Sequence, residues 1–470
     1  MLSSRSTAML SKLTLLSLCG SLSLLQAQTP TAAPGTPNYV PAAAVDITQI
    51  TAQSLNTTLS GVVLSMPPDG ADSSEIFLNP TFGLAQSGNG NGNGGPAGNG
   101  NPHAAGTGAP GLLTVPTFTG EWFAQAGPSA KGTKLWRYAM MGNDPALGGT
   151  TRIPAKIDEV SLQLLNADGS VFKVVSYSPF ETPTLQSPNF QNTSYSSSPN
   201  PTQFEDAVHR AQFFSTMANN PPWHTMLEAT VVNRATITVP FFVNVRLSNG
   251  NIVQARSYFT GTAADGSTFV LMLNLLFNFF FDNEVVNNIN GGLFTTDALN
   301  ITAFPNTFLF SLNVNNPNVP GGCCVLGFHT FFFENGPVPQ PRWITDYASW
   351  ISPGIFGGGF QDVTAFSHEI AESFGDPFLD NATPSWQFPG QPANSKVCQA
   401  NLEEGDPIEV LANATTAISI KVTGQSFTYH PQNIPLLQWF EMGPTSDAIG
   451  GAFSYPDTTV LPHSAIPCPQ

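Results

Sequence analysis

The residues best suited to chemistry are His368, Glu369 and Glu372, which lie together in one pentapeptide. Positions i and i+4 share one face of a helix, so His368 and Glu372 would lie side by side. An imidazole nitrogen and a carboxylate oxygen both bind zinc at about 2.0–2.2 Å. A carboxylate next to them can take a proton from a metal-activated water. The spacing therefore predicts metal ligands at His368 and Glu372 and a general base at Glu369.

A helix must position these side chains. Asp362 or Thr364 is expected to cap its start, and Gly375 followed by Pro377 is expected to end it. At about 100° per residue, one stripe of the helix gathers the apolar residues Val363, Phe366, Ile370 and Phe374. The opposite face carries the histidine and both glutamates without Lys or Arg. This favours the wall of a cleft over the other interpretation, a solvated surface helix.

A catalytic zinc normally has three protein ligands and an open position, so one more ligand is needed. The extended form of the motif, which continues as His-x-x-Gly-x-x-His, would place the third ligand at position 378. This chain has Phe378 there, so that form is excluded. The remaining candidates are the acidic cluster Glu403-Glu404-Gly405-Asp406, His329 on an expected strand, and Asp376 just past the helix. Asp376 could instead orient a ligand, and His329 could be a ligand, an oxyanion donor or a buried structural histidine. The acidic run at 403–406 could also be a solvated loop.

Several short motifs surround the pentapeptide in chain order. They are Gly327-Phe328-His329, then His368 to Glu372, Asp376-Pro377, Trp386 and Glu403-Glu404-Gly405-Asp406. In this order, over about residues 321–410, the chain resembles the plant phosphate-induced, EXORDIUM-like secreted proteins and related bacterial exported proteins described as metalloproteases. The resemblance implies a zincin-like domain, a metal held by His368 and Glu372, and a third ligand at Glu403 or Asp406. The chain departs from the family at Ile408, where the family has a cysteine that Cys398 could replace, and in its longer spacing to Trp386.

The predicted function is that of an exported, metal-dependent peptidase acting on peptide or protein substrates. Zinc is the expected cofactor, and the oxygen-rich ligand pair would also suit Mn²⁺ or Ca²⁺. The alternative is a non-catalytic secreted or cell-surface protein with a structural metal site or a polysaccharide-binding role. Glu369 beside His368 favours the enzyme, since a structural site needs no general base.

The first residues have the pattern of a secretory signal. Arg5 and Lys12 precede the apolar stretch Leu13–Leu25, and Leu25-Gln26-Ala27 offers a cleavage site. A signal at 1–27 predicts a secreted, extracellular or periplasmic protein. The most apolar later stretch, Phe269–Phe281, is too short to span a bilayer and is expected in the core. Residues 28–111 are expected to be flexible and of low complexity, with one or two strands at Val45–Met66 and a disordered Gly/Asn-rich run at 87–111.

Composition limits the partners and the cross-links. The net charge is −16 with only 15 Lys and Arg, which argues against nucleic acid or an anionic membrane as a partner. Charged residues make up 10% of the chain, so the surface must be largely uncharged and would suit an acidic medium. Four cysteines follow the signal. The adjacent Cys323 and Cys324 are expected to bond to different partners, which leaves Cys398 and Cys468.

The fold class expected is α+β, with a zincin-like domain whose mixed or antiparallel sheet packs on the active-site helix. Residues 112–470 should form one or two globular domains, with the core of the metal-binding part at about 290–470. Strands are expected at Val160–Leu165, Val171–Val175, Thr236–Leu247, Thr307–Val314 and Val325–Phe333. A helix is expected at Phe204–Met217, with Asp206, His209 and Arg210 facing solvent, and His224 is expected to be structural.

Overall fold

The computed structural model describes residues 84–86, 114–125, 133–218, 223–246, 252–334, 341–356, 359–390, 398–409, 411–422 and 424–468. The predicted signal at 1–27, the strands predicted within Val45–Met66 and the Gly/Asn-rich run at 87–111 lie outside the described residues. The described chain is α+β, as predicted, and it is rich in strands.

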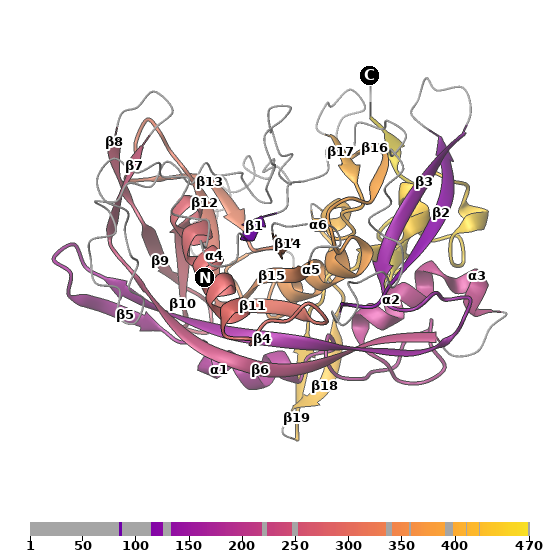
Figure 1. The fold of residues 1–470 in the computed structure, drawn as a ribbon, viewed down its shortest axis with the longest axis horizontal. Helices are drawn as coiled ribbons and strands as arrows, with labels where there is room; N and C mark the ends of the chain where they lie inside the picture. The colour runs from indigo at the N-terminus through magenta and orange to yellow at the C-terminus, as the bar shows by residue number, and fades with distance from the viewer. Residues whose placement is uncertain are drawn as a thin grey trace, which may run out of the picture.

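A seven-stranded sheet forms the centre of the fold (Figure 1). Its strands follow the order β1-β14-β15-β11-β4-β5, and β6 also pairs with β4. The sheet is mixed, since β15, β11, β4 and β6 are parallel while the β1–β14, β14–β15 and β4–β5 pairs are antiparallel. The strands are β1 (Leu84–Gln86), β4 (Gly149–Leu165), β5 (Val171–Val175), β6 (Trp223–Val239), β11 (Leu299–Pro305), β14 (Gly327–Glu334) and β15 (Arg342–Trp350).

The long strand β4 contributes to both large cores. Its first half buries Ile153, Ala155 and Ile157 in the core that also receives helix α5 (Thr364–Gly375). Its second half buries Val160 and Leu164 in the core around helix α4 (Asn274–Asn290). The buried positions are odd-numbered in the first half of β4 and even-numbered in the second half. Because successive residues of a strand face opposite sides, the buried apolar side chains of the two halves lie on opposite faces of the sheet. The sheet therefore carries one helix-covered core on each side.

The apolar run at 269–281 is core, as predicted. It divides into the end of strand β10 (Thr268–Leu273) and the first half of α4. Phe277 and Phe281 of α4 pack against Phe328 of β14, and Phe277 also packs against Tyr347 of β15. Strand β10 belongs to a second sheet with the order β13-β12-β10-β9. Its other strands are β9 (Tyr258–Thr262), β12 (Thr307–Leu312) and β13 (Pro320–Val325).

Two carboxyl groups meet where α4 packs on β4. Asp158 is fully buried and accepts a hydrogen bond from Asn288 at 2.7 Å. Burial, and then the charge of neighbouring Glu284, raise the pKa of Asp158 from 3.8 to about 8. Between these values the folded protein holds a proton that the unfolded chain releases. The contribution of Asp158 to stability therefore falls as the pH rises through this window.

The helix predicted at Phe204–Met217 is present as α2 (Phe204–Gln212) followed by the short α3 (Phe214–Met217). The prediction that its polar residues face solvent is wrong, because Asp206, His209 and Arg210 are all buried. Helix α2 lies between β6 and α5, so it has no free face. Asp206 is satisfied there by His224 Nδ1 at 2.7 Å and by the backbone N–H of Thr225 at 2.6 Å, which agrees with a structural role for His224.

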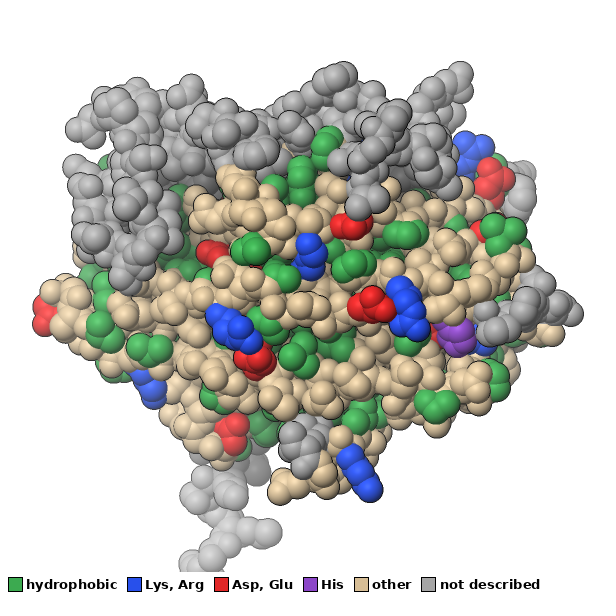
Figure 2. Space-filling view, turned by 60° about the horizontal axis from the view of Figure 1, so that its bottom comes forward, with side chains coloured by type: hydrophobic (Ala, Val, Ile, Leu, Met, Phe, Trp, Pro, Cys, Tyr) green, Lys and Arg blue, Asp and Glu red, His purple; other side chains and the backbone are tan. Residues whose placement is uncertain are grey.

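The remaining elements form smaller layers around these cores. They are α1 (Ser178–Leu185), α6 (Asp406–Glu409), α7 (Leu437–Phe440), the 3₁₀ helix η4 (Thr445–Asp447), β2 (Thr117–Gln125), β3 (Thr133–Met141), β7 (Phe242–Arg246), β8 (Ile252–Arg256), β16 (Ala382–Gln387), β17 (Cys398–Asn401), β18 (Ile418–Val422), β19 (Gln425–Tyr429), β20 (Ile434–Pro435), β21 (Ser454–Tyr455) and β22 (Ile466–Pro467). The face in Figure 2 carries scattered charged side chains among many uncharged ones, in keeping with the composition. Within the described residues, no helix combines the length and apolar character that crossing a membrane requires.

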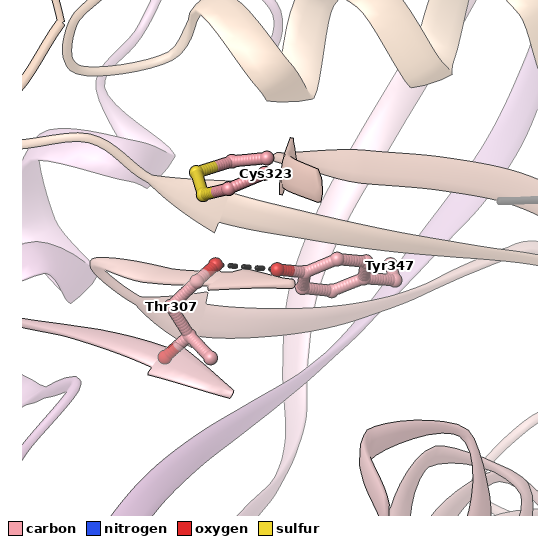
Figure 3. Close-up of a disulfide and its surroundings, with 4 residues drawn as sticks. Thr307, Cys323 and Tyr347 are labelled. Atoms are coloured by element: carbon pink, nitrogen blue, oxygen red, sulfur yellow. Dashed lines mark hydrogen bonds between the residues drawn. A yellow bond between two sulfur atoms is a disulfide. The ribbon is translucent and has the colours of Figure 1, made fainter. Parts of the chain in front are cut away.

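The predicted cysteine pairing is wrong. Cys323 is joined to Cys324 on β13, close to the hydrogen bond that Tyr347 donates to the carbonyl of Thr307 (Figure 3). Cys398 pairs with Cys468, with their Cα atoms 6.0 Å apart. Both β17 and β22 pair with the end of β16, which brings these two distant cysteines together.

Candidate metal centre

Helix α5 lies near the centre of the view in Figure 1. It supplies three candidate side chains, His368, Glu369 and Glu372. The apolar stripe predicted for it is buried in one core: Val363, Phe366, Ile370 and Phe374. The N-cap of the helix is Val363, so the prediction of Asp362 or Thr364 at that position is wrong. Asp362 instead accepts hydrogen bonds from the backbone N–H groups of Val363 and His430. The helix ends at Gly375, as predicted.

The polar face of α5 is also covered. Glu369 and Glu372 are each 4% exposed, and the side chain of His368 is 12% exposed. The predicted cleft wall is therefore closed on most sides by β14, β15, α2 and the segment that leads into α6. His368 Nε2 lies 3.1 Å from Glu372 Oε1, so the two predicted ligands do face one another.

Strand β14 brings His329 to the same place. Its neighbour Phe328 points into the α4 core, so the alternation of the strand turns His329 toward α5. His329 Nδ1 lies 3.0 Å from Glu372 Oε2, and His329 Nε2 lies 3.8 Å from Glu403 Oε2. Of the three roles open to His329, the position beside two carboxylates fits a ligand, and the contact with Glu372 adds a fourth role, that of orienting a ligand.

The acidic run at 403–406 reaches the centre and is not a solvated loop. The side chains of Glu403 and Asp406 are each 15% exposed, and Glu404 is fully buried. Asp406 Oδ1 lies 3.6 Å from His368 Nε2, and the N–H of Gly405 donates to Glu372 Oε1 at 3.1 Å. Both alternatives for the third ligand are thus within reach of the helix.

Asp376 has a different role from a ligand. It is fully buried and accepts hydrogen bonds from the backbone N–H groups of Asp380 at 2.9 Å and Asn381 at 3.1 Å. These bonds hold the turn that follows α5. Asp376 therefore supports the end of the helix.

Gln432 is a supporting residue that sequence reasoning did not identify. His368 Nδ1–H donates to Gln432 Oε1 at 3.1 Å, and Gln432 Nε2 donates to the carbonyl of Gly405. The first bond leaves the lone pair of His368 Nε2 free toward Glu372 and Asp406. A metal-binding histidine is commonly held by such a bond. Gln432 lies 64 residues from His368 in the chain and no local pattern marks it.

Glu369 lies against strand β14. A Cβ atom on Gly327 would be 2.4 Å from Glu369 Oε1, so only glycine leaves room for this carboxylate. Glu369 Oε2 is buried and has no hydrogen-bond partner among the described residues. Burial raises the pKa of Glu369 well above its usual value, the charge of His368 opposes this shift, and Glu372 adds to it.

The two imidazoles and the carboxylates perturb one another strongly. Burial alone would raise the pKa of Glu372, but His368 and His329 hold it well below its usual value. Burial alone would lower the pKa of His329, but Glu372 and Glu403 raise it to about 10. The carboxylates thus favour the protonated, positively charged form of the imidazoles, and a bound cation would supply positive charge at the same place.

These residues fit a divalent cation. One ligand atom from each of His368, Glu372 and Asp406 lies within 4.8 Å of the other two, and the same holds for His329, Glu372 and Glu403. Imidazole nitrogen with carboxylate oxygen is a donor set used for zinc and manganese. The buried His329 Nε2 has no hydrogen-bond partner among the described residues, and a cation could satisfy it.

Comparisons with known proteins add no identification: no family profile, no curated protein and no solved structure matches this chain. The resemblance to EXORDIUM-like proteins stays a prediction, and the functional argument rests on the geometry of the centre.

Proposed function

We propose that this chain is an exported, metal-dependent peptidase with a zincin-like centre and zinc as its cofactor. One observation carries the proposal. Two predicted ligands, His368 and Glu372, meet a third candidate ligand, Asp406, at ligand spacing, with Glu369 next to His368 in the chain. A purely structural ion would not require a buried carboxylate with an unpartnered oxygen at that position.

Each residue has a defined task in this proposal. Zinc, when bound, would lower the pKa of a water molecule and polarise the scissile carbonyl. Glu369 would accept the proton of that water and pass it to the leaving amine. Gln432 fixes the orientation of His368, and His329 fixes that of Glu372.

Access to this centre is expected from the side of the segment that leads into α6. The side chains of His368, Glu403 and Asp406 are 12–15% exposed, whereas Glu369 and Glu372 are 4% exposed. The exposed edge thus belongs to ligand candidates, and the proposed base lies deeper. An extended peptide approaching that edge would place its carbonyl next to the metal position.

Hydrolysis of a peptide library by the metal-loaded mature protein tests this function. Glu369→Gln should retain the metal and lose at least about 100-fold in kcat, because it removes the proton acceptor and leaves the ligands. Glu404→Gln is the matched control, since Glu404 is an equally buried carboxylate outside both ligand groups. Equal activity in the wild type and Glu369→Gln would contradict the proposal.

The competing function is a non-catalytic secreted protein with a structural ion, and the burial of the ligand atoms favours it. In that case the metal-loaded protein would hydrolyse nothing in the library, and a chelator would lower its melting temperature. Loss of hydrolysis together with retained folding after chelation would favour the enzyme.

A further inference from the structure

We propose that Arg342 binds a carboxylate of the peptide substrate and gives the centre a preference for acidic peptides, an inference that rests on the proposed function. The carboxylate could belong to an acidic side chain or to the C-terminus of the peptide. In both cases the guanidinium would donate two parallel hydrogen bonds to the carboxylate oxygens. The peptidase proposed above does not require this preference.

Two aromatic rings hold the guanidinium of Arg342. Its Cζ lies 4.7 Å from the ring centre of Phe378 and 5.4 Å from that of Phe331. A cation over an aromatic face is attracted by the ring quadrupole, and the flat guanidinium is well suited to such stacking. The two rings also contact each other edge to face, with 5.5 Å between their centres. The aromatic pair thus positions the guanidinium before a ligand binds.

Strand register places Arg342 on the same face of the sheet as the centre. In the β14–β15 pair, Arg342 lies opposite Phe333, and Asp346 lies opposite His329. Odd-numbered residues of β14 share one face, because side chains alternate along a strand, and directly opposite residues of an antiparallel pair also share a face. This is the face that meets α5, because His329 contacts Glu372 of that helix.

The separation between Arg342 and the centre suits an extended peptide. Phe331, over which Arg342 lies, is two residues along β14 from His329, or about 7 Å at about 3.3 Å per residue. An extended peptide advances by a similar amount per residue. A peptide with its scissile carbonyl at the metal position would therefore bring a carboxylate two or three residues away within reach of the guanidinium.

Arg342 has no carboxylate partner among the described residues. The salt bridges of arginine in this part of the chain are made by Arg137, Arg152 and Arg234, and Arg342 also makes no described hydrogen bond through its side chain. Burial lowers the pKa of Arg342, and the charge of Asp380 offsets this effect only in part. A half-buried charge without a paired carboxylate is costly, and a bound peptide carboxylate would reduce that cost.

Peptide binding tests this role without depending on turnover. The probes are fluorescent N-acetylated hexapeptide amides that carry one Glu, or Gln in its place, at each position in turn. The zinc-loaded protein, with Glu369→Gln to prevent turnover, should bind the Glu peptide about 10- to 100-fold more tightly at one or two neighbouring positions, as expected for charge-assisted hydrogen bonds. If the C-terminus is the recognised group, the free acids of the Gln peptides should instead bind more tightly than the amides.

Variants assign the preference to Arg342. Arg342→Gln should abolish it, and Arg342→Lys should retain part of it, because lysine keeps the charge without the planar fork. Arg256→Gln is the matched control and should retain the full preference. Arg256 is also stacked on two phenylalanine rings, but it belongs to β8, which lies toward the left of Figure 1, whereas β15 lies near the centre. Circular dichroism would verify that each variant is folded.

The outcomes separate this role from the proposed function. Equal binding of paired Glu and Gln peptides, and of free acids and amides, would overturn the role of Arg342 and leave the peptidase standing. A preference that persists in Arg342→Gln would do the same. A preference that requires Arg342, in a chain whose wild type hydrolyses nothing in the peptide library, would support the carboxylate site and contradict the peptidase. No binding of any peptide would overturn the site.

Discussion

Replacing Gly405 with alanine should weaken metal binding without touching a ligand. The new Cβ would lie 2.4 Å from Cδ2 and Nε2 of His368 and 2.5 Å from Cε1. Non-bonded heavy atoms prefer separations of about 3.5–4.0 Å, so the imidazole must retreat by about 1 Å. A zinc–nitrogen bond of about 2.0–2.1 Å tolerates only about 0.2 Å. His368 would therefore leave the ion.

The expected loss of affinity is about 10- to 100-fold or more, which is the range for disturbing the support of a ligand. Competition with a chromophoric chelator of known affinity would measure it. Gly405→Ala keeps the backbone N–H that donates to Glu372, so the loss should come from His368. Gly443→Ala is the matched control, because its nearest contact would be Asp447 Oδ2 at 3.3 Å.

Unchanged zinc affinity in a folded Gly405→Ala protein would refute the reasoning, since it would mean that His368 is not a ligand. Loss of affinity in the Gly443→Ala control would refute it in another way, because the effect would then not be local to the centre.

Three further predictions concern the stability of the fold. Asp158→Asn should make the free energy of unfolding fall less steeply between about pH 4 and 8, by up to about 1.4 kcal/mol per pH unit. Urea titration at several pH values would measure this beside the exposed control Glu228→Gln. Equal slopes of unfolding free energy against pH in the wild type and Asp158→Asn would contradict the prediction. Asn381→Ala should cost about 3 kcal/mol, because the side chain bonds the N–H and C=O of residue 139 and the C=O of residue 375; a change below about 0.5 kcal/mol in the urea midpoint analysis would count against it. Replacing Cys398 and Cys468 together with serine should cost about 4 kcal/mol, from the loop of 70 residues that their bond closes; an unchanged melting temperature would argue against that bond.

The raised pKa of Asp158 bears on the prediction that the protein suits an acidic medium. Sequence composition predicted this from a surface with few charges. The structure adds a buried carboxyl that favours the folded state more at low pH than at neutral pH.

The features of α5 that could be predicted from the sequence are those set by helical period. Phe366 and Phe374 fall on the stripe that the core receives, and His368 and Glu372 meet because they are four residues apart. The convergence of His329 and the acidic run on this helix was suggested by type and order of residues. It could not be derived from spacing, because separate elements supply them.

The errors arose where tertiary packing decides the outcome. Periodicity places Asp206 and His209 on the polar face of α2, but it does not show that α5 and β6 cover that face. Likewise, chain distance gives no sign that β17 and β22 bring Cys398 to Cys468. Gln432 was missed for the same reason.

The most direct test of the central claim is a crystal structure of the zinc-soaked protein with anomalous diffraction data collected on both sides of the zinc edge. The account predicts an anomalous peak about 2.0–2.2 Å from His368 Nε2, Glu372 Oε1 and Asp406 Oδ1. An ordered centre with no zinc peak, or zinc bound only elsewhere on the chain, would contradict it.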